Sequence, residues 1–159
     1  MTLPGINHLL AQPDKYLKGK TVGLVVNHTS LTSDHKHSIA HFNSHPSFTL
    51  TALFAPEHGL YGIAQDMIEI ENEVDPVSGL TISSLYGKTE ATLEPDPAAL
   101  VGIDNLIFDI QDVGARYYTF IYTMAKCMGI CKKSGTRMIV CDRPNPINGV
   151  SLEGNLVAE

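Results

Sequence analysis

The chain lacks several features that identify large classes of protein. It has no apolar run near the ~20 residues of a membrane-spanning helix, and its N-terminus lacks the basic start and apolar centre of a signal peptide. Lysine and arginine total 11 against 17 acidic residues, which gives a formal charge of −6. Such a charge does not suit a surface that follows nucleic-acid phosphates, so neither DNA nor RNA is the expected partner.

Cysteine is scarce as well, with three residues in the chain. Cys127 and Cys131 are four apart in a predicted helix and Cys141 ends an apolar strand, which favours buried structural thiols. The chain lacks the paired C-x2-C units of a zinc site, and its histidines form no H-E-x-x-H motif. His35 and His37 are assigned to a solvated helix, and we expect no resident metal.

Glycine-rich nucleotide motifs are also missing. Neither G-x-G-x-x-G nor G-x-x-x-x-G-K-[ST] follows the first apolar strand, which disfavours a nucleotide cofactor, and we expect none. The chain has 159 residues, 43% of them hydrophobic. A chain of this size buries about two thirds of its unfolded surface. We therefore expect a single domain over 1–159 that needs no disulfide.

Apolar runs alternate with amphipathic stretches along the chain. The predicted strands are 21–26, 47–54, 80–85, 105–110 and 137–141. The predicted helices are 5–12, about 34–43 and 117–133, with a helical turn at 96–102. In the last helix, one face carries Tyr118, Ile121, Tyr122, Ala125 and Met128. This alternation predicts βαβ units, and hence an α/β fold with a largely parallel sheet.

Polar clusters follow four of the predicted strands. Ligands in open α/β sheets bind outside the carboxyl ends of the strands, so we expect these clusters to converge on one edge. The candidates are Asn27 after the first strand, Glu57 and His58 after the second, Gln111, Asp112 and Arg116 after the strand at 105–110, and Asp142, Arg143 and Asn145 after the last.

Other interpretations of these clusters remain open. Asp109 and Asp112 carry oxygen ligands that suit a divalent cation, and with His58 they would make a metal-dependent hydrolase. An ion pair of either acid with Arg116 is at least as good an interpretation. The acidic stretch 66–75 predicts a solvated loop, with a lid over the cleft as the alternative.

Glycoside hydrolysis suits an acidic cleft bordered by tyrosine and amide side chains. It requires a carboxyl group that protonates the leaving oxygen, commonly a second carboxylate, and neutral groups that bind sugar hydroxyls. Glu57 lies in a proline-bounded, partly apolar turn, where the pKa of a carboxyl group can rise toward neutrality. A catalytically silent sugar-binding module would use the same polar groups without turnover.

Four blocks of sequence together resemble the peptidoglycan exo-β-N-acetylmuramidase family. They are GLVVNHTS at 23–30, ALFAPEHGLYG at 52–62, DIQDVGARYYT at 109–119 and DRPNPING at 142–149. The resemblance implies a Rossmann-like, three-layer N-terminal domain with a mostly parallel sheet and helices on both faces. It also implies hydrolysis that releases N-acetylmuramic acid from the non-reducing end of cell-wall glycan fragments, with Glu57 as the best candidate for the catalytic acid.

The same resemblance places further residues in the cleft. His58 and Asp112 join Glu57 as candidates for catalysis. The lactyl carboxylate of muramic acid needs a cation, for which Arg116 and Arg143 are available. The implied substrate-binding residues are Asn27, Gln111, Arg116, Tyr117, Asp142, Arg143, Asn145 and Glu153. The expected partner is a muramic-acid-containing glycan.

Members of that family are considerably longer than this chain and carry a C-terminal subdomain that helps to enclose the substrate. The resemblance therefore implies that 1–159 is the N-terminal half. Weak or absent activity is expected for it alone, and pairing with the missing half is expected to complete the site. The family is bacterial with some exported members, so the resemblance assigns no compartment.

Overall fold

The computed structural model describes residues 2–56, 59–62, 73–85 and 97–155, which form a six-stranded sheet. The strands are β1 (Thr21–Val26), β2 (Thr49–Ala55), β3 (Glu73–Val74), β4 (Thr81–Ser84), β5 (Asn105–Asp109) and β6 (Arg137–Val140). Their order across the sheet is β3-β4-β2-β1-β5-β6, and all neighbours are parallel except β3 and β4. The prediction of an α/β fold with a mostly parallel sheet is confirmed.

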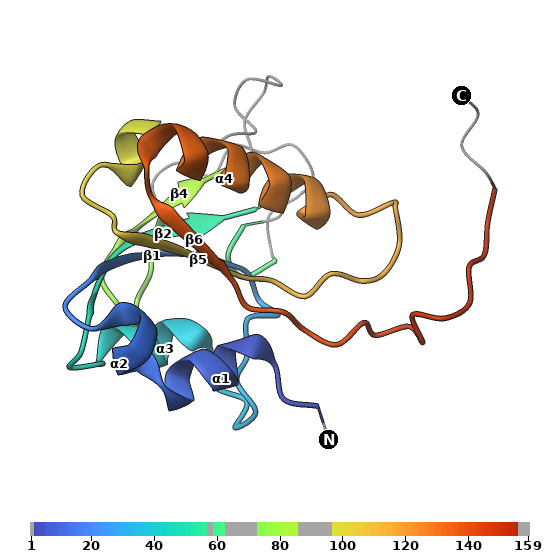
Figure 1. The fold of residues 1–159 in the computed structure, drawn as a ribbon, viewed down its shortest axis with the longest axis horizontal. Coiled ribbons are helices and arrows are strands. Elements are labelled where there is room, and N and C mark those ends of the chain that lie inside the picture. The colour runs from blue at the N-terminus through green and yellow to red at the C-terminus, as the bar shows by residue number, and fades with distance from the viewer. Residues whose placement is uncertain (1, 57–58, 63–72, 86–96, 156–159) are drawn as a thin grey trace.

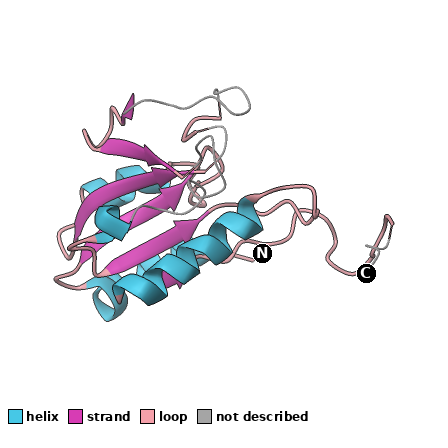
Figure 2. Ribbon diagram, turned by 90° about the horizontal axis from the view of Figure 1, so that it is seen from above, coloured by secondary structure: helices cyan, strands magenta, loops and turns pink. Residues whose placement is uncertain are grey.

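Helices cover both faces of the sheet, which gives the three layers (Figure 1). One face carries α1 (Gly5–Ala11), α2 (Pro13–Leu17) and α3 (Ser38–Asn43). The other carries α4 (Phe120–Ser134) and the 3-10 helix η2 (Pro97–Leu100). Figure 2 shows α4 running alongside the strands. Among the described residues, no helix has the length and apolar character needed to cross a membrane.

After Thr21, β1 carries no polar side chain, because both of its faces are covered. Val22, Leu24 and Val26 pack with the core residues beneath α1 and α3, whereas Val25 packs with the core residues beneath α4. All four are completely buried. Each such side chain contributes about 1.5–3 kcal/mol through removal from water, so the central strand is fixed firmly and its carboxyl end is a rigid support for the loop that follows.

All three cysteines are buried and unpaired, in agreement with structural thiols. Burial raises the pKa of the Cys127 thiol and of the Cys141 thiol to about 12. Neither therefore forms a reactive thiolate near neutral pH.

α3 begins later than the sequence predicts. Leu31 and His37 form an isolated antiparallel bridge, and His37 caps the helix, because its Nδ1 accepts from the Ile39 N–H at 3.3 Å. Its Nε2 donates to the Asn27 carbonyl at 2.9 Å. Burial lowers the pKa of His37, which favours the neutral ring that these two bonds require. The assignment of His37 to a solvated helix is therefore wrong.

The orientation of α4 also differs from the simplest interpretation of its pattern. Its buried residues are Phe120, Thr123, Cys127, Ile130 and Cys131. Tyr118, Ile121, Tyr122 and Met128, which share one face in the predicted helix, are about half exposed. Both sides of the helix are rich in apolar residues, so periodicity alone does not identify the side that faces the sheet.

Candidate functional site

The turn that follows β2 is anchored on both sides of Glu57 and His58, although these two candidates lie outside the described residues. The Gly59 N–H donates to the Pro56 carbonyl at 3.1 Å. Leu60 is completely buried in the core beneath α3. The described residues on either side of Glu57 and His58 are therefore held at fixed points, at the carboxyl end of β2.

Tyr61 and Gly62 connect the C-terminal side of this turn to neighbouring loops. The Tyr61 hydroxyl donates to Asp75 Oδ1 at 2.6 Å. Gly62 has a φ of +70°, and a Cβ added there would lie 2.7 Å from Nδ1 of His28, so the imidazole packs directly on the glycine. The turn after β2 is thus held against the loop after β1 and against the residues after β3.

Asp75 is completely buried and well supplied with donors. The Ser78 N–H and hydroxyl both donate to its Oδ2 at 2.7 Å. Burial raises the pKa of Asp75, but the bonds from Tyr61 and Ser78 outweigh it and hold the pKa below its ordinary value of 3.8. Burial and the neighbouring carboxylate raise the pKa of Tyr61, which stays a donor. The prediction of a solvated loop is wrong at Asp75, and 66–72 lie outside the described residues.

Replacing Tyr61 by phenylalanine is expected to lower the free energy of unfolding by about 1.5 kcal/mol at pH 7, the low end for a hydrogen bond to a charged group. The ionised Asp75 contributes stability above pH 3.8 and loses it as the pH falls through its lowered folded-state pKa. The difference between the two proteins should therefore shrink below pH 3.8. Urea denaturation across pH measures it, with the exposed Tyr117→Phe as control; a pH-independent difference would refute this role.

The loop after β1 is joined to the loop after β5. Asn27 Oδ1 accepts from the N–H and the hydroxyl of Thr29, at 2.9 and 2.6 Å. The Thr29 hydroxyl oxygen in turn accepts from the Gln111 N–H at 3.1 Å, and the Ser30 hydroxyl donates to the Asp109 carbonyl. Asn27 is buried, so its side chain shapes these loops from within.

A buried ion pair joins the loops after β1 and β6 to the end of β5. Arg143 Nε lies 2.9 Å and Nη2 lies 2.7 Å from Asp109 Oδ1, and Nη2 also donates to the Leu31 carbonyl at 3.0 Å. The side chains are 7% and 0% exposed. Burial raises the pKa of Asp109, and the Arg143 guanidinium opposes this. Asp109 pairs with Arg143, in place of the Arg116 considered from the sequence.

The loops after β5 and β6 also contact each other directly. Gln111 Nε2 donates to the carbonyls of Asp112 and Pro144, at 2.7 and 2.9 Å. A Cβ added at Gly114 would lie 2.5 Å from Oδ1 of Asn145, so these residues are in close contact. Three candidates from two strand ends, Gln111, Asp112 and Asn145, are therefore held within one network.

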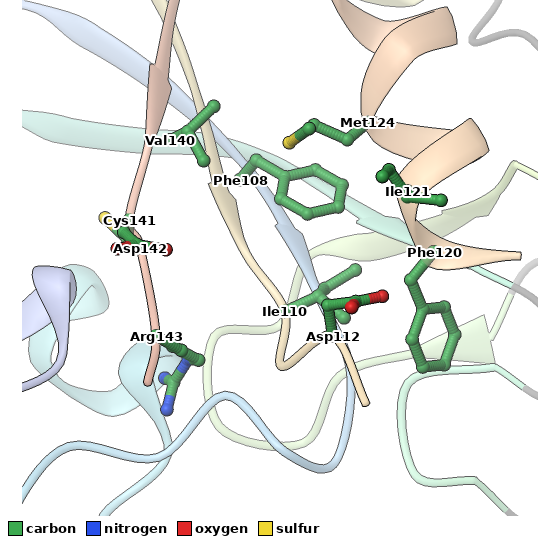
Figure 3. A pocket seen from close by; sticks show the side chains of 10 residues that line it. All are labelled: Phe108, Ile110, Asp112, Phe120, Ile121, Met124, Val140, Cys141, Asp142 and Arg143. Carbon is green, nitrogen blue, oxygen red and sulfur yellow. The ribbon is translucent and has the colours of Figure 1, made fainter. Parts of the chain in front are cut away.

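A hollow of about 180 Å³ lies beside this network, between β5, β6 and α4. Figure 3 shows the Asp112 carboxylate directed toward Phe120, with Phe108, Val140 and Met124 around the apolar part. Asp142 and Arg143 line the same hollow. Asp112 Oδ2 accepts from the Gly114 N–H at 2.8 Å, which fixes the direction of the carboxylate.

The remaining candidates lie farther out. Tyr117 is 92% exposed, and Arg116 Nη2 donates to the Asn155 carbonyl at 2.5 Å. Glu153 is exposed on the segment 144–155, which leaves the body of the protein beyond β6 (Figure 1). In the described part of the chain, no group of three histidine, cysteine, aspartate or glutamate residues is placed to hold a metal. His58 is not described, so the metal alternative stays a prediction.

Sequence reasoning missed the residues that hold the loops together, namely Ser30, His37, Tyr61 and Asp75. For Asp75 a signal was present, because Asp-x-x-Ser is typical of a turn in which the carboxylate accepts from the residue three positions later. For Ser30 and Tyr61, the partners are Asp109 and Asp75, 79 and 14 positions away, and no local pattern indicates them. His37 bonds locally to Ile39, but its second bond, to the Asn27 carbonyl, depends on the fold of the loop after β1.

Comparison with known proteins gives the family. Residues 22–159 match the family described as exo-beta-N-acetylmuramidase NamZ, N-terminal. The chain belongs to the NamZ family. It is 44% identical, over 153 residues, to the peptidoglycan beta-N-acetylmuramidase NamZ of Bacillus subtilis. That alignment covers 96% of this chain and 36% of the relative, so the chain spans just over a third of the relative's length.

Two solved structures share the fold of this NamZ-family chain. A DUF1343 family protein from Bacteroides fragilis superimposes with a TM-score of 0.84 at 39% identity, over 99% of this chain and 38% of that one. A second DUF1343 family protein from the same organism gives a TM-score of 0.68 at 31% identity, over 91% and 35%. The Rossmann-like, three-layer arrangement inferred from the resemblance agrees with these neighbours.

Proposed function

We propose that this chain supplies the N-terminal part of an exo-β-N-acetylmuramidase, a glycoside hydrolase that releases N-acetylmuramic acid from the non-reducing end of peptidoglycan fragments during cell-wall turnover. The observation that carries the proposal is the joining of four strand-end loops at one edge of the sheet. Asp109 and Arg143 connect three of them, and Gly62 against His28 connects the fourth. The similarity to the B. subtilis enzyme supports the reaction class.

Glu57 is the proposed general acid. His58, the next residue, is proposed as a further catalytic group. A glycosidase of this kind needs a carboxyl group that stays protonated until it reaches the leaving oxygen. Asp112 is the proposed second catalytic group, because its carboxylate is oriented by Gly114 and borders the hollow. A separation of ~5 Å between two such carboxyl groups suits retention and ~6.5–9.5 Å suits inversion. Asp142 and Glu153 are the alternatives to Asp112.

Substrate binding is assigned to the polar groups around the hollow. Gln111, Asp142 and Asn145 would contact sugar hydroxyls, with Tyr117 at the outer border and Asn27 supporting the loops. Arg143 is committed to Asp109 and to the Leu31 carbonyl, whereas Arg116, among the described residues, donates to a single backbone carbonyl. We therefore assign the lactyl carboxylate of muramic acid to Arg116.

The site is open on one side. The chain spans 36% of the relative's length, and we propose that 1–159 is a single N-terminal domain whose cleft is completed by a C-terminal region. Orientation and exclusion of water by a second wall lower a reaction barrier by several kcal/mol. The chain alone should then hold its loops correctly and turn over substrate weakly or not at all.

A chromogenic N-acetylmuramide tests this function. We expect little turnover by the chain alone, and turnover that EDTA does not affect once the C-terminal region of the B. subtilis relative is fused after residue 159. Binding without turnover by the fused protein would instead indicate a sugar-binding module. Loss of turnover in EDTA would indicate a metal-dependent hydrolase that uses Asp109, Asp112 and His58. If the fused protein neither binds nor hydrolyses the N-acetylmuramide, the proposed function is wrong.

A further inference from the structure

α4 exposes an apolar face in addition to the one that it buries. Ile121, Tyr122 and Met128 are 51%, 60% and 53% exposed, and Ala125 is exposed between them. Ile121, Ala125 and Met128 follow the i, i+4, i+7 spacing of one helical stripe. A second apolar face on a helix is typical of a helix that is covered on that face as well. The outer face of α4 thus has the composition of an interface.

Two hollows adjoin this face and share a wall. One, of about 180 Å³, lies between β5, β6 and α4, and the other, of about 460 Å³, lies between the 112–116 loop and α4. Asp112 and Ile121 line both. Val140, at the far border of the first hollow, is 46% exposed on the edge strand β6. We call the face formed by Ile121, Tyr122, Ala125, Met128 and Val140 the α4 outer surface.

The segment 144–155 presents further apolar side chains. Ile147, Val150 and Leu152 are 54%, 85% and 100% exposed. Figure 1 shows this segment leaving β6 and passing outside the loop that precedes α4. The bond from Arg116 to the Asn155 carbonyl ties the segment to a residue that lines the larger hollow. The segment is therefore linked to the α4 outer surface through the 112–116 loop.

The charges near the surface indicate the character of its partner. α4 carries Lys126, Lys132 and Lys133 and no acidic residue, in a chain whose formal charge is −6. Aliphatic, methionine and tyrosine side chains at the centre, with Arg116 at the border, resemble the core of a protein interface more closely than a glycan platform. A protein face with an apolar centre and an acidic rim is complementary to this arrangement.

We propose that the α4 outer surface is the docking site for the C-terminal region of the NamZ family, and that the segment 144–155 is clasped in the same interface. This proposal rests on the proposed function, which assumes that the working enzyme contains such a C-terminal region. The length of the relatives favours this occupant, because this chain covers 36% of one and 38% of another. Docking there would place the partner against Asp112 and so wall the hollow on its open side.

Isothermal titration of this chain with the separately produced C-terminal region of the B. subtilis relative tests the proposal without any turnover. We expect binding, and an increase of at least tenfold in Kd for Ile121→Asp, about 1.4 kcal/mol. The matched control is Val77→Asp, because Val77 is 54% exposed and its carbonyl accepts from Asn43 of α3, on the opposite face. Equal Kd values for the two variants would overturn the proposal.

Hydrogen exchange on the fused protein covers the case in which the separate region does not fold. Relative to the isolated chain, backbone amides at 121–128 and 147–152 should exchange at least tenfold more slowly, and those at 73–81 should be unchanged. Unchanged exchange at 121–128 would overturn the proposal even if the fused protein is active. Protection by muramyl glycan alone would assign the surface to substrate and also overturn it. Failure of turnover with protection intact would count against the proposed function only.

Discussion

Replacing Arg143 by methionine is expected to lower the free energy of unfolding by about 3–5 kcal/mol, the usual cost of removing one partner of a buried ion pair. Methionine retains the apolar part of the side chain but leaves the completely buried Asp109 without its cation. It also removes the donor to the Leu31 carbonyl. Urea denaturation measures the change, and the m-value shows whether unfolding stays two-state.

Two variants distinguish this effect from a general loss of charge. Arg116→Met removes an exposed guanidinium and should change stability by no more than about 0.5 kcal/mol. Adding Asp109→Asn to Arg143→Met should recover part of the loss, because no uncompensated charge is then buried. If Arg143→Met is no less stable than Arg116→Met, the ion pair does not hold the loops and the account of the site is wrong.

Replacing Glu57 by glutamine is expected to lower kcat of the fused, complete enzyme by about 10²–10⁴-fold, the usual contribution of a general acid. Glutamine preserves the size of the side chain but cannot deliver a proton to the leaving oxygen. The thermal midpoint should stay within a few degrees of the parent. Turnover of N-acetylmuramide at saturating substrate, together with a thermal scan, measures both.

The control for this change is Glu73→Gln, which makes the same replacement on the edge strand β3. It should leave kcat unchanged. A Glu57→Gln enzyme with the kcat of its parent would assign the acid to another residue. If the Glu57→Gln variant unfolds, Glu57 stabilises the turn after β2 and is not shown to act as the acid.

The sheet could be predicted because its central strands are buried on both faces. β1 and β5 appear in the sequence as largely apolar runs, and their bounds are found within a residue. α4 was found as a helix, but its orientation was not, since Ile121 and Met128 are as apolar as the residues it buries. Periodicity identifies the covered side only where the other side is polar.

The location of the site could be predicted from the sequence, but the contacts that hold it together could not. Strand ends mark where Asn27, Gln111 and Asp142 must lie, because a parallel sheet brings them to one edge. The partners of Arg143 were not predictable. Asp109 is 34 positions away and Leu31 is 112 positions away, so only the folded chain brings them together.

Product analysis on a defined disaccharide tests the central claim most directly. The substrate is N-acetylmuramic acid linked β-1,4 to N-acetylglucosamine, offered to the fused, complete enzyme beside the same disaccharide in reversed order. Mass spectrometry should detect free N-acetylmuramic acid from the first substrate and no cleavage of the second. Equal cleavage of both, or cleavage of neither, would contradict the claim that these strand-end loops form a muramidase site.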